Sequence, residues 1–302
     1  MVKIRYHHDA DGISSAYMCH FGVKGAELDG WDGIFGDTTG LTDGDWMVDM
    51  RPIIDMKGLN LIDHHGPHSH LKNVNLVSVK ETPASLQCWE YFKDSIPKEQ
   101  WWKVVIGVVG DGQPELIPPE VFEECPMLLQ NWKTSIYQNY GKWKPNYFPM
   151  YKLLSSGVNA LLRMHKFEDA INVLKFSQTP DEILTDTRVA RAKGQVSAEF
   201  KRIMDNCKAY QLPFLDVYLY ESKYRMTGYV ASTMGSATDK TVIAINTLNG
   251  SGSLRGDLSA YIRYKTKHLD YLTLDGHPGF MGLKIKNGVG TEIFIDDLIK
   301  LI

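Results

Sequence analysis

His7-His8-Asp9-Ala10-Asp11-Gly12 is an acidic turn that lies between two patterned segments. Residues 2–6 alternate between apolar and polar side chains, as a strand does, and residues 13–20 are amphipathic, as a helix is. In an open α/β sheet such a turn lies at the carboxyl ends of the strands, where ligands bind. Because an acidic turn repels phosphate unless cations intervene, the stretch predicts a metal site.

The spacing within this stretch supports the prediction. His7, Asp9 and Asp11 are two residues apart, and in extended backbone alternate side chains project to the same side. A second interpretation is that an aspartate only caps the helix and His7 packs at the end of the strand. The stretch alone leaves both interpretations open.

Composition limits the class of protein. The chain has 302 residues, of which 43% are hydrophobic and 11% aromatic, so it can build two domains with real cores and is not a disordered chain. The formal net charge is −3 and the isoelectric point is near 6.4, so no overall basic field attracts long nucleic acid. Any polyanion must therefore be held locally.

The cysteines and the apolar runs indicate the compartment. Cys19, Cys88, Cys125 and Cys207 form no CxxC pair, which argues against a zinc site and against a dense disulfide framework. We find no leader pattern and no apolar run near 18 residues, so we expect a cytoplasmic protein without a membrane partner. Seven of the ten histidines lie within the first 70 residues. We therefore expect any function of the histidines to lie in the N-terminal part of the chain.

Three later apolar runs also end in acidic or histidine residues. They are 46–48 followed by Asp49, 59–62 followed by Asp63-His64-His65, and 104–110 followed by Asp111. A lone aspartate after a strand is usually a turn residue, but here one pattern occurs four times. Parallel strands that alternate with helices would bring all four ends to the same edge of a sheet.

The remainder of the chain predicts two further regions. Residues 113–210 have a mostly helical and connective pattern, with a helix expected over about 180–207. Aromatic and lysine residues alternate over 132–151, which fits either base stacking or a loop packed on the core. The α/β pattern returns from residue 212. We therefore expect a catalytic domain over 1–125, a helical connector over 126–210 and a substrate-binding domain over 211–302.

Two glycine-rich turns stand out in the last region. Residues 251–256 and 275–279 combine small residues, which let backbone amides approach an anion, with Arg255 and His277, which can form charge-assisted hydrogen bonds. Together with an acidic metal centre in the first domain, they suggest a phosphate held in a cleft between two domains.

In this order the motifs resemble the DHH phosphoesterase superfamily, specifically the branch with the first type of DHH-associated C-terminal domain. Residues 7–12 are similar to its first motif, Asp49 to its second, Asp63-His64-His65 to its third and Asp111 to its fourth. Ser253-Leu254-Arg255 and Gly276-His277-Pro278 are similar to the substrate motifs of that branch, although the usual glycine-rich run is reduced to Asp275-Gly276. The resemblance covers nearly the whole chain.

The resemblance implies an α/β fold with a parallel-sheet catalytic domain and a role for each motif residue. The implied metal ligands are His7 and Asp9 on one ion, Asp11, His64 and Asp111 on the other, and Asp49 as a bridge. Asp63 would orient a histidine and His65 would contact the scissile phosphate or a leaving oxygen. The implied substrate-binding residues are Ser253, Arg255, Gly276 and His277. Mixed carboxylate and imidazole ligands favour two Mn²⁺ ions, with Mg²⁺ as an alternative.

The implied activity is a manganese-dependent phosphodiesterase that acts as an exonuclease on single-stranded or short nucleic acid. The HxDxDG form of the first motif is most similar to RecJ-type proteins. One alternative is a phosphodiesterase or phosphatase for cyclic dinucleotides or small nucleotides. Another is a non-catalytic nucleotide-binding module, whose signature would be the loss of a metal ligand.

Overall fold

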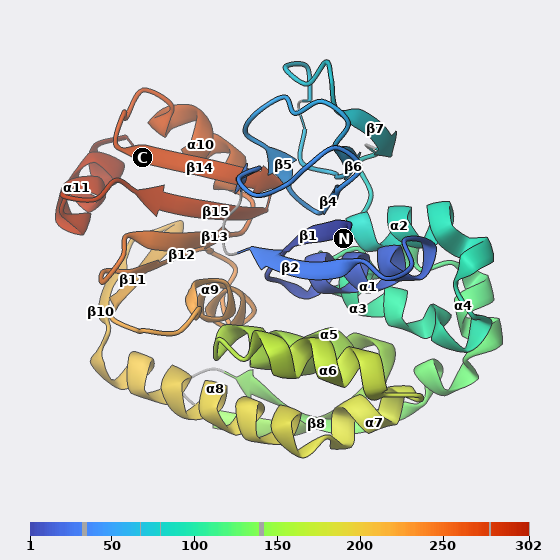
Figure 1. Ribbon diagram of the computed structural model, residues 1–302. Coiled ribbons are helices and arrows are strands. Elements are labelled where there is room, and N and C mark those ends of the chain that lie inside the picture. Colours follow the sequence, from blue (N-terminus) through green and yellow to red (C-terminus); the bar gives the residue numbers. More distant parts are fainter. Residues whose placement is uncertain (32–34, 67, 79, 139–141, 278, 302) are drawn as a thin grey trace. The chain divides into compact units, whose positions relative to one another are not determined.

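A five-stranded parallel sheet forms the centre of the N-terminal part (Figure 1). The computed structural model describes residues 1–31, 35–66, 68–78, 80–138, 142–277 and 279–301. The sheet has the order β2-β1-β4-β6-β7, with all neighbours parallel. Its strands are β1 Lys3–His7, β2 Glu27–Trp31, β4 Trp46–Val48, β6 Asn60–Ile62 and β7 Asn75–Ser78. The carboxyl ends of β1, β4 and β6 therefore meet at one edge, as the sequence predicted.

Helices pack against this sheet and against each other. Those of the first 130 residues are α1 Ala10–Gly22, α2 Ala84–Phe92, α3 Val104–Gly110 and α4 Pro119–Glu124. Short 3₁₀ helices cover Lys93–Ser95, Lys98–Lys103, Pro114–Leu116 and Pro126–Leu129. The two-residue strands β3 Phe35–Gly36 and β5 Arg51–Pro52 form a small parallel pair. Helix α1 packs on β1, α2 and α3.

The apolar run 104–110 is a helix and not a strand, which corrects the prediction of four strand ends. Helix α3 is buried over Val104–Val108, and a helix that is buried on every side has no polar face to reveal its period. Asp111 therefore follows the end of a helix. It still reaches the same site, because α3 packs against α1, whose first turn carries Asp11.

Lys103 is a buried cation at the start of α3. Its side chain is 0% exposed, and Nζ donates a hydrogen bond of 3.1 Å to the Tyr17 hydroxyl. Nζ also lies 4.5 Å from the centre of the Tyr17 ring and 5.3 Å from that of Trp102. Burial lowers the pKa of Lys103 from 10.5 to about 7, so the core holds a lysine that titrates near neutrality.

The middle of the chain departs from the helical connector that we expected over 126–210. Strands β8 Asn131–Gln138 and β9 Lys142–Pro149 form a two-stranded sheet of their own. Helices occupy the remainder, namely α5 Tyr151–Arg163, α6 Phe167–Phe176, α7 Pro180–Thr185 and α8 Thr187–Asn206. The expected helix over 180–207 is divided because Asp186 is extended and its Oδ1 accepts the Arg188 amide. Three of the aromatic side chains of 132–151 lie outside the described set, those of Tyr137, Tyr140 and Trp143.

A six-stranded mixed sheet forms the core of the C-terminal part, in the order β10-β11-β12-β13-β15-β14. Its strands are β10 Lys208–Gln211, β11 Leu215–Tyr220, β12 Thr241–Asn246, β13 Ser251–Arg255, β14 Leu272–His277 and β15 Phe280–Ile285. The helices are α9 Thr227–Gly235, α10 Ser259–Thr266 and α11 Thr291–Leu301. Strands β11 and β12 are buried at every residue, and their apolar side chains join those of β13, β15 and α11 in one core.

The chain divides into two compact units, residues 1–134 with 146–193 and residues 135–145 with 194–302. The predicted α/β class, with a parallel N-terminal sheet and a second, smaller α/β part, is confirmed. The three-part division at residues 125 and 210 stays a prediction. Among the described residues, no helix has the length and apolar character needed to cross a membrane.

Candidate metal centre

Four segments of the first unit bring histidines and aspartates together. They follow β1, β4, β6 and α3, and they carry the six predicted ligands together with His65. We call these seven residues the His/Asp cluster: His7, Asp9, Asp11, Asp49, His64, His65 and Asp111. Within it, three groups have ligand atoms that all lie within 4.8 Å of one another: His7 with Asp9 and Asp49, Asp11 with His64 and Asp111, and Asp49 with His64 and His65.

Asp9 combines the two interpretations that the sequence left open. Its Oδ1 accepts the Gly12 amide at 2.9 Å and so caps α1, while its Oδ2 lies 2.8 Å from Nδ1 of His7. The capping hydrogen bond fixes the orientation of the Asp9 carboxylate, and its Oδ2 faces His7 at the end of β1. Helix capping and a place in the cluster are therefore compatible.

Asp49 is the centre of the cluster. It follows β4 with a φ of 57°, a left-handed conformation that is uncommon for a residue other than glycine but tolerated by aspartate. The side chain is 1% exposed, with Oδ1 3.0 Å from Nε2 of His64 and Oδ2 3.8 Å from Nδ1 of His7. Neither carboxylate oxygen accepts a hydrogen bond from the described residues. A buried carboxylate in this state is costly unless a cation compensates it.

Asp11 is held by the beginning of α2. Its Oδ2 accepts the Ala84 amide at 2.7 Å and its Oδ1 the Ser85 amide at 3.0 Å. Burial raises the pKa of Asp11 to about 6, against the opposing effect of the hydrogen bonds from Ser85 and Ala84. Burial together with the charges of Asp11 and Asp9 raises the pKa of Asp111 to about 8.

The aspartates of the cluster thus repel one another. Burial and the charges of Asp9, Asp11 and Asp111 also raise the pKa of Asp49 well above its usual range. His64 lies among these carboxylates, since its Nδ1 is 3.4 Å from Oδ2 of Asp111. Carboxylates that gather with raised pKa values are the environment in which a divalent cation binds and displaces protons. The donor set, carboxylate and imidazole without thiolate, fits a Mn²⁺-type ion.

Asp63 and His65 form a hydrogen-bonded pair beside the cluster. Asp63 is 0% exposed, and its Oδ1 accepts a hydrogen bond of 2.8 Å from Nδ1 of His65. Burial opposes ionisation of Asp63, but the hydrogen bond and charge of His65 lower its pKa below the usual value. Burial likewise lowers the pKa of His65, and the bond and charge of Asp63 outweigh it and raise that pKa to about 9. The hydrogen bond therefore favours an ionised Asp63 together with a protonated His65.

Three further side chains adjoin residues of the cluster or of the Asp63–His65 pair. The side chain of His68 is only 12% exposed, and its Nε2 lies 3.5 Å from Oδ2 of Asp63. Gln113 donates a hydrogen bond of 3.2 Å to Oδ2 of Asp111. Its position two residues after Asp111 is the sequence feature from which this contact could be predicted. His8 stacks on Phe167 with ring centres 3.8 Å apart.

Gly107 supports the site from α3. A Cβ at this position would lie 2.2 Å from Oγ of Ser85 and 2.5 Å from Oδ1 of Asp11. We expect Gly107→Ala to lower the free energy of unfolding by about 1–3 kcal/mol, because overpacking must displace α2 or Asp11. A titration with Mn²⁺ should also show weaker binding, by roughly tenfold or more.

Gly194→Ala is the matched control for this prediction. Gly194 lies within α8, and a Cβ there would meet no atom within 4 Å. Urea unfolding should show a gain of about 0.5–1 kcal/mol for this variant, with unchanged Mn²⁺ binding. Equal behaviour of the two alanine variants would refute the supporting role of Gly107.

The predicted substrate residues lie on two strands of the second unit, β13 and β14, which flank β15. Arg255 of β13 and His277 of β14 both pair with Phe280 of β15, and the side chain of His277 is outside the described set. Gly276 has a φ of 125°, which favours glycine. The hydroxyl of Ser253 is buried and donates a hydrogen bond of 3.3 Å to the Met281 carbonyl.

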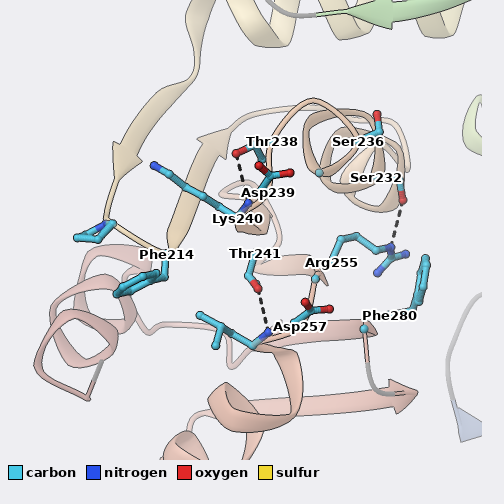
Figure 2. A pocket seen from close by; sticks show the side chains of 15 residues that line it. Phe214, Ser232, Ser236, Thr238, Asp239, Lys240, Thr241, Arg255, Asp257 and Phe280 are labelled. Atoms are coloured by element: carbon cyan, nitrogen blue, oxygen red, sulfur yellow. Dashed lines mark hydrogen bonds between the residues drawn. The ribbon is translucent and has the colours of Figure 1, made fainter.

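Arg255 lines a pocket of about 850 Å³ in this unit (Figure 2). Its Nε donates a hydrogen bond of 3.1 Å to Oγ of Ser232, and its guanidinium lies 5.0 Å from the centre of the Phe280 ring. Figure 2 shows Arg255 and Phe280 side by side at one end of the pocket, with Phe214 and Lys240 further along it. The pocket combines aromatic and cationic side chains.

No protein-family model matches the sequence, and no curated protein matches it. Solved structures do match the fold. The DHH domain of a protein described as a member of a family of ribosomal proteins is 12% identical, with a TM-score of 0.66 over 99% of this chain and 85% of that one. The chain has the DHH-domain fold.

Two other structures share the DHH-domain fold with this chain. RecJ from Thermus thermophilus, solved in complex with Mn²⁺, is 15% identical with a TM-score of 0.61, and the match covers 99% of this chain and 52% of RecJ. The chain thus spans about half the length of that RecJ. A pGpG-specific phosphodiesterase, PggH from Vibrio cholerae, is 12% identical with a TM-score of 0.53, over 100% of this chain and 99% of PggH.

Proposed function

We propose that this chain is a Mn²⁺-dependent phosphodiesterase that hydrolyses single-stranded or short nucleic acid. The observation that carries the proposal is Asp49, a buried carboxylate without a hydrogen bond from the described residues, surrounded by histidines and aspartates. Such a site is stabilised by divalent cations. Its place on the DHH-domain fold, which RecJ with bound Mn²⁺ shares, supports phosphodiester chemistry.

The geometry suggests how the ligands divide. His7 and Asp9 would hold one ion, Asp11, His64 and Asp111 the other, and Asp49, which belongs to groups on both sides, would join them. A pair of divalent ions supplies an activated water and stabilises the leaving oxygen of an in-line displacement. Mg²⁺ is the alternative ion, because carboxylates bind it as well.

The Asp63–His65 pair would act on the substrate itself. Asp63 fixes the orientation of the imidazole through Nδ1, and the raised pKa of His65 keeps that ring protonated at neutral pH. During hydrolysis a water oxygen forms a bond to phosphorus, and the bond from phosphorus to the leaving oxygen breaks. His65 would donate a hydrogen bond to a phosphate oxygen or to that leaving oxygen. Arg255 and His277 of the second unit would hold a terminal phosphate of the substrate.

A cyclic-dinucleotide or small-nucleotide phosphodiesterase is the second candidate. The match to the pGpG-specific phosphodiesterase covers 100% of this chain and 99% of that one, whereas only about half of RecJ is matched. A chain of this length thus suffices for a dinucleotide substrate in a related fold.

A substrate ladder separates these candidates. Metal-free protein would receive Mn²⁺ or Mg²⁺, with 5′-labelled RNA and DNA of two to about thirty nucleotides, pGpG and a cyclic dinucleotide as substrates. We expect Mn²⁺-dependent release of mononucleotides, and loss of at least about 10³-fold in rate in Asp111→Asn. Turnover confined to dinucleotides would favour the second candidate. Binding without turnover of any substrate would favour a nucleotide-binding module and overturn the proposal.

A further inference from the structure

Helix α10 presents aromatic and cationic side chains to solvent. Ile262 and Thr266 are buried and attach the helix to the second unit. Tyr261 is 43% exposed and Tyr264 is 65% exposed, and both lie on the side of the helix away from Ile262. The two tyrosines are about one helical turn apart and form an exposed aromatic face. This face does not contribute to the packing of α10 on the second unit.

The charge of this segment is opposite to that of the whole chain. Residues 259–268 include Arg263, Lys265 and Lys267 and no acidic residue, whereas the chain has a net charge of −3. Nζ of Lys265 lies 5.4 Å from the centre of the Tyr261 ring, and Nζ of Lys267 lies 4.4 Å from that of Tyr264. Each exposed ring thus has a lysine beside it. In a single strand of nucleic acid the bases can stack on the rings, and the phosphates can pair with the lysines.

Hydrogen bonds join α10 to the end of β14, which carries Gly276 and His277, and to the turn that follows it. Oγ of Ser259 accepts the Gly279 amide at 2.6 Å, and Nη1 of Arg263 donates to the Gly276 carbonyl at 3.4 Å. Phe280, which is 56% exposed and lies beside Arg255, directly follows that turn. Helix α10 is therefore hydrogen-bonded, through Ser259 and Arg263, to the segment that carries two of the residues expected to hold the end of a substrate.

We propose that Tyr261, Tyr264, Lys265 and Lys267 form a binding surface for the bases and phosphates that follow the terminal nucleotide of a single-stranded substrate. This inference rests on the proposed function, because it names the substrate class as strands longer than a dinucleotide. A surface of stacking rings and lysines binds with little sequence preference.

The test uses the full chain and dT12, a labelled 12-nucleotide single strand, with binding measured by fluorescence anisotropy in EDTA so that no metal-dependent hydrolysis occurs. We expect Tyr261→Ala/Tyr264→Ala to weaken binding by about tenfold or more, because stacking contributes several-fold per base. Tyr261→Phe/Tyr264→Phe should bind within about twofold of the unsubstituted chain, since the rings remain. Mn²⁺-dependent hydrolysis of a dinucleotide should be unchanged in both pairs.

Two further variant sets complete the test. Lys265→Gln/Lys267→Gln should reduce the slope of log K against log salt by about 1.4, which corresponds to two phosphate contacts. Tyr91→Ala, at a tyrosine 56% exposed in the first unit, and Lys98→Gln/Lys201→Gln, at exposed lysines, should bind dT12 like the unsubstituted chain. If the tyrosine-to-alanine pair does not fold, the lysine pair decides.

The outcomes for the two proposals are distinct. Unchanged dT12 binding in the alanine and lysine pairs, or no binding of dT12 to the unsubstituted chain, overturns the surface on α10 even where dinucleotides are hydrolysed. Loss of dT12 binding in those pairs supports the surface. Failure of the unsubstituted chain to hydrolyse any substrate would overturn the proposed function alone.

Discussion

Asp49→Asn is expected to abolish metal-dependent hydrolysis while making the metal-free chain more stable. The two effects have opposite signs because Asp49 is buried, accepts no hydrogen bond from the described residues and lies among like charges. Without metal, removal of this charge should raise the free energy of unfolding by about 1–3 kcal/mol. Asparagine also tolerates the left-handed backbone that Asp49 adopts, with a φ of 57°.

When metal is bound, Asp49→Asn should no longer be more stable to unfolding than the unsubstituted chain. A ligand that binds only the folded state stabilises it by about 2.7 kcal/mol at a hundred times its Kd, so Mn²⁺ should raise the Tm of the unsubstituted chain and hardly alter that of Asp49→Asn. The rate of phosphodiester hydrolysis should fall by about 10³-fold or more. Thermal melts in EDTA and in Mn²⁺, with the substrate ladder, measure all three quantities.

Asp45→Asn is the matched control for Asp49→Asn. Asp45 is also buried, at 2% exposed, but its carboxylate accepts the Lys3 amide at 2.7 Å and the Thr42 amide at 2.6 Å. This variant should lose stability and keep both its Mn²⁺ response and its activity. If Asp49→Asn instead resembled Asp45→Asn, Asp49 would be a structural residue and the metal centre would lie elsewhere.

Lys103→Met is expected to stabilise the chain most at neutral pH and below. The folded pKa of Lys103 is about 7 and the ordinary value is 10.5, so between these values the unfolded chain binds more protons and stability rises with pH. Below pH 7 the full cost of a buried ammonium is present. The substitution removes this cost, which is on the order of 4–5 kcal/mol at pH 7 and below and approaches zero near pH 10.5.

Urea unfolding of the metal-free chain between about pH 6 and 10 checks the Lys103 prediction. The gain for Lys103→Met should shrink steadily as the pH rises above the folded pKa of about 7. Lys98→Met is the control, because Lys98 has a side chain 67% exposed and should give a small difference without a pH trend. A gain for Lys103→Met that did not depend on pH would mean better packing and not the loss of a buried charge.

The sequence predicted the cluster because its residues follow a repeated local pattern. Apolar strands that end in acid or histidine are recognisable in β1, β4 and β6, and parallel pairing brings their ends together. Asp111 lies in the cluster although it follows α3 and not a strand, so the predicted fourth strand end was wrong. A fully buried segment of this length has no polar face from which its period can be read.

The supporting contacts could not be predicted, because they join residues far apart in the chain. The amides of Ala84 and Ser85 donate to Asp11 across 73 and 74 positions, and nothing in a propensity or a local pattern encodes that pairing. The strand β8, the division between α7 and α8, and the partly buried His68 were likewise decided by tertiary packing. Local patterns therefore predicted the residues of the His/Asp cluster, and tertiary packing determined the contacts that support them.

The two hydrogen bonds from the first turn of α2 to the Asp11 carboxylate can be followed by NMR spectroscopy. The Ala84 and Ser85 amides point at the same carboxylate that the proposed metal would share, at 2.7 and 3.0 Å. Any cation that withdraws electron density from Asp11 must therefore weaken these two bonds and change the chemical shifts of their protons. If Asp11 binds the proposed metal, the amide NMR signals of Ala84 and Ser85 should shift when a diamagnetic ion such as Mg²⁺ is added, without substrate and without turnover.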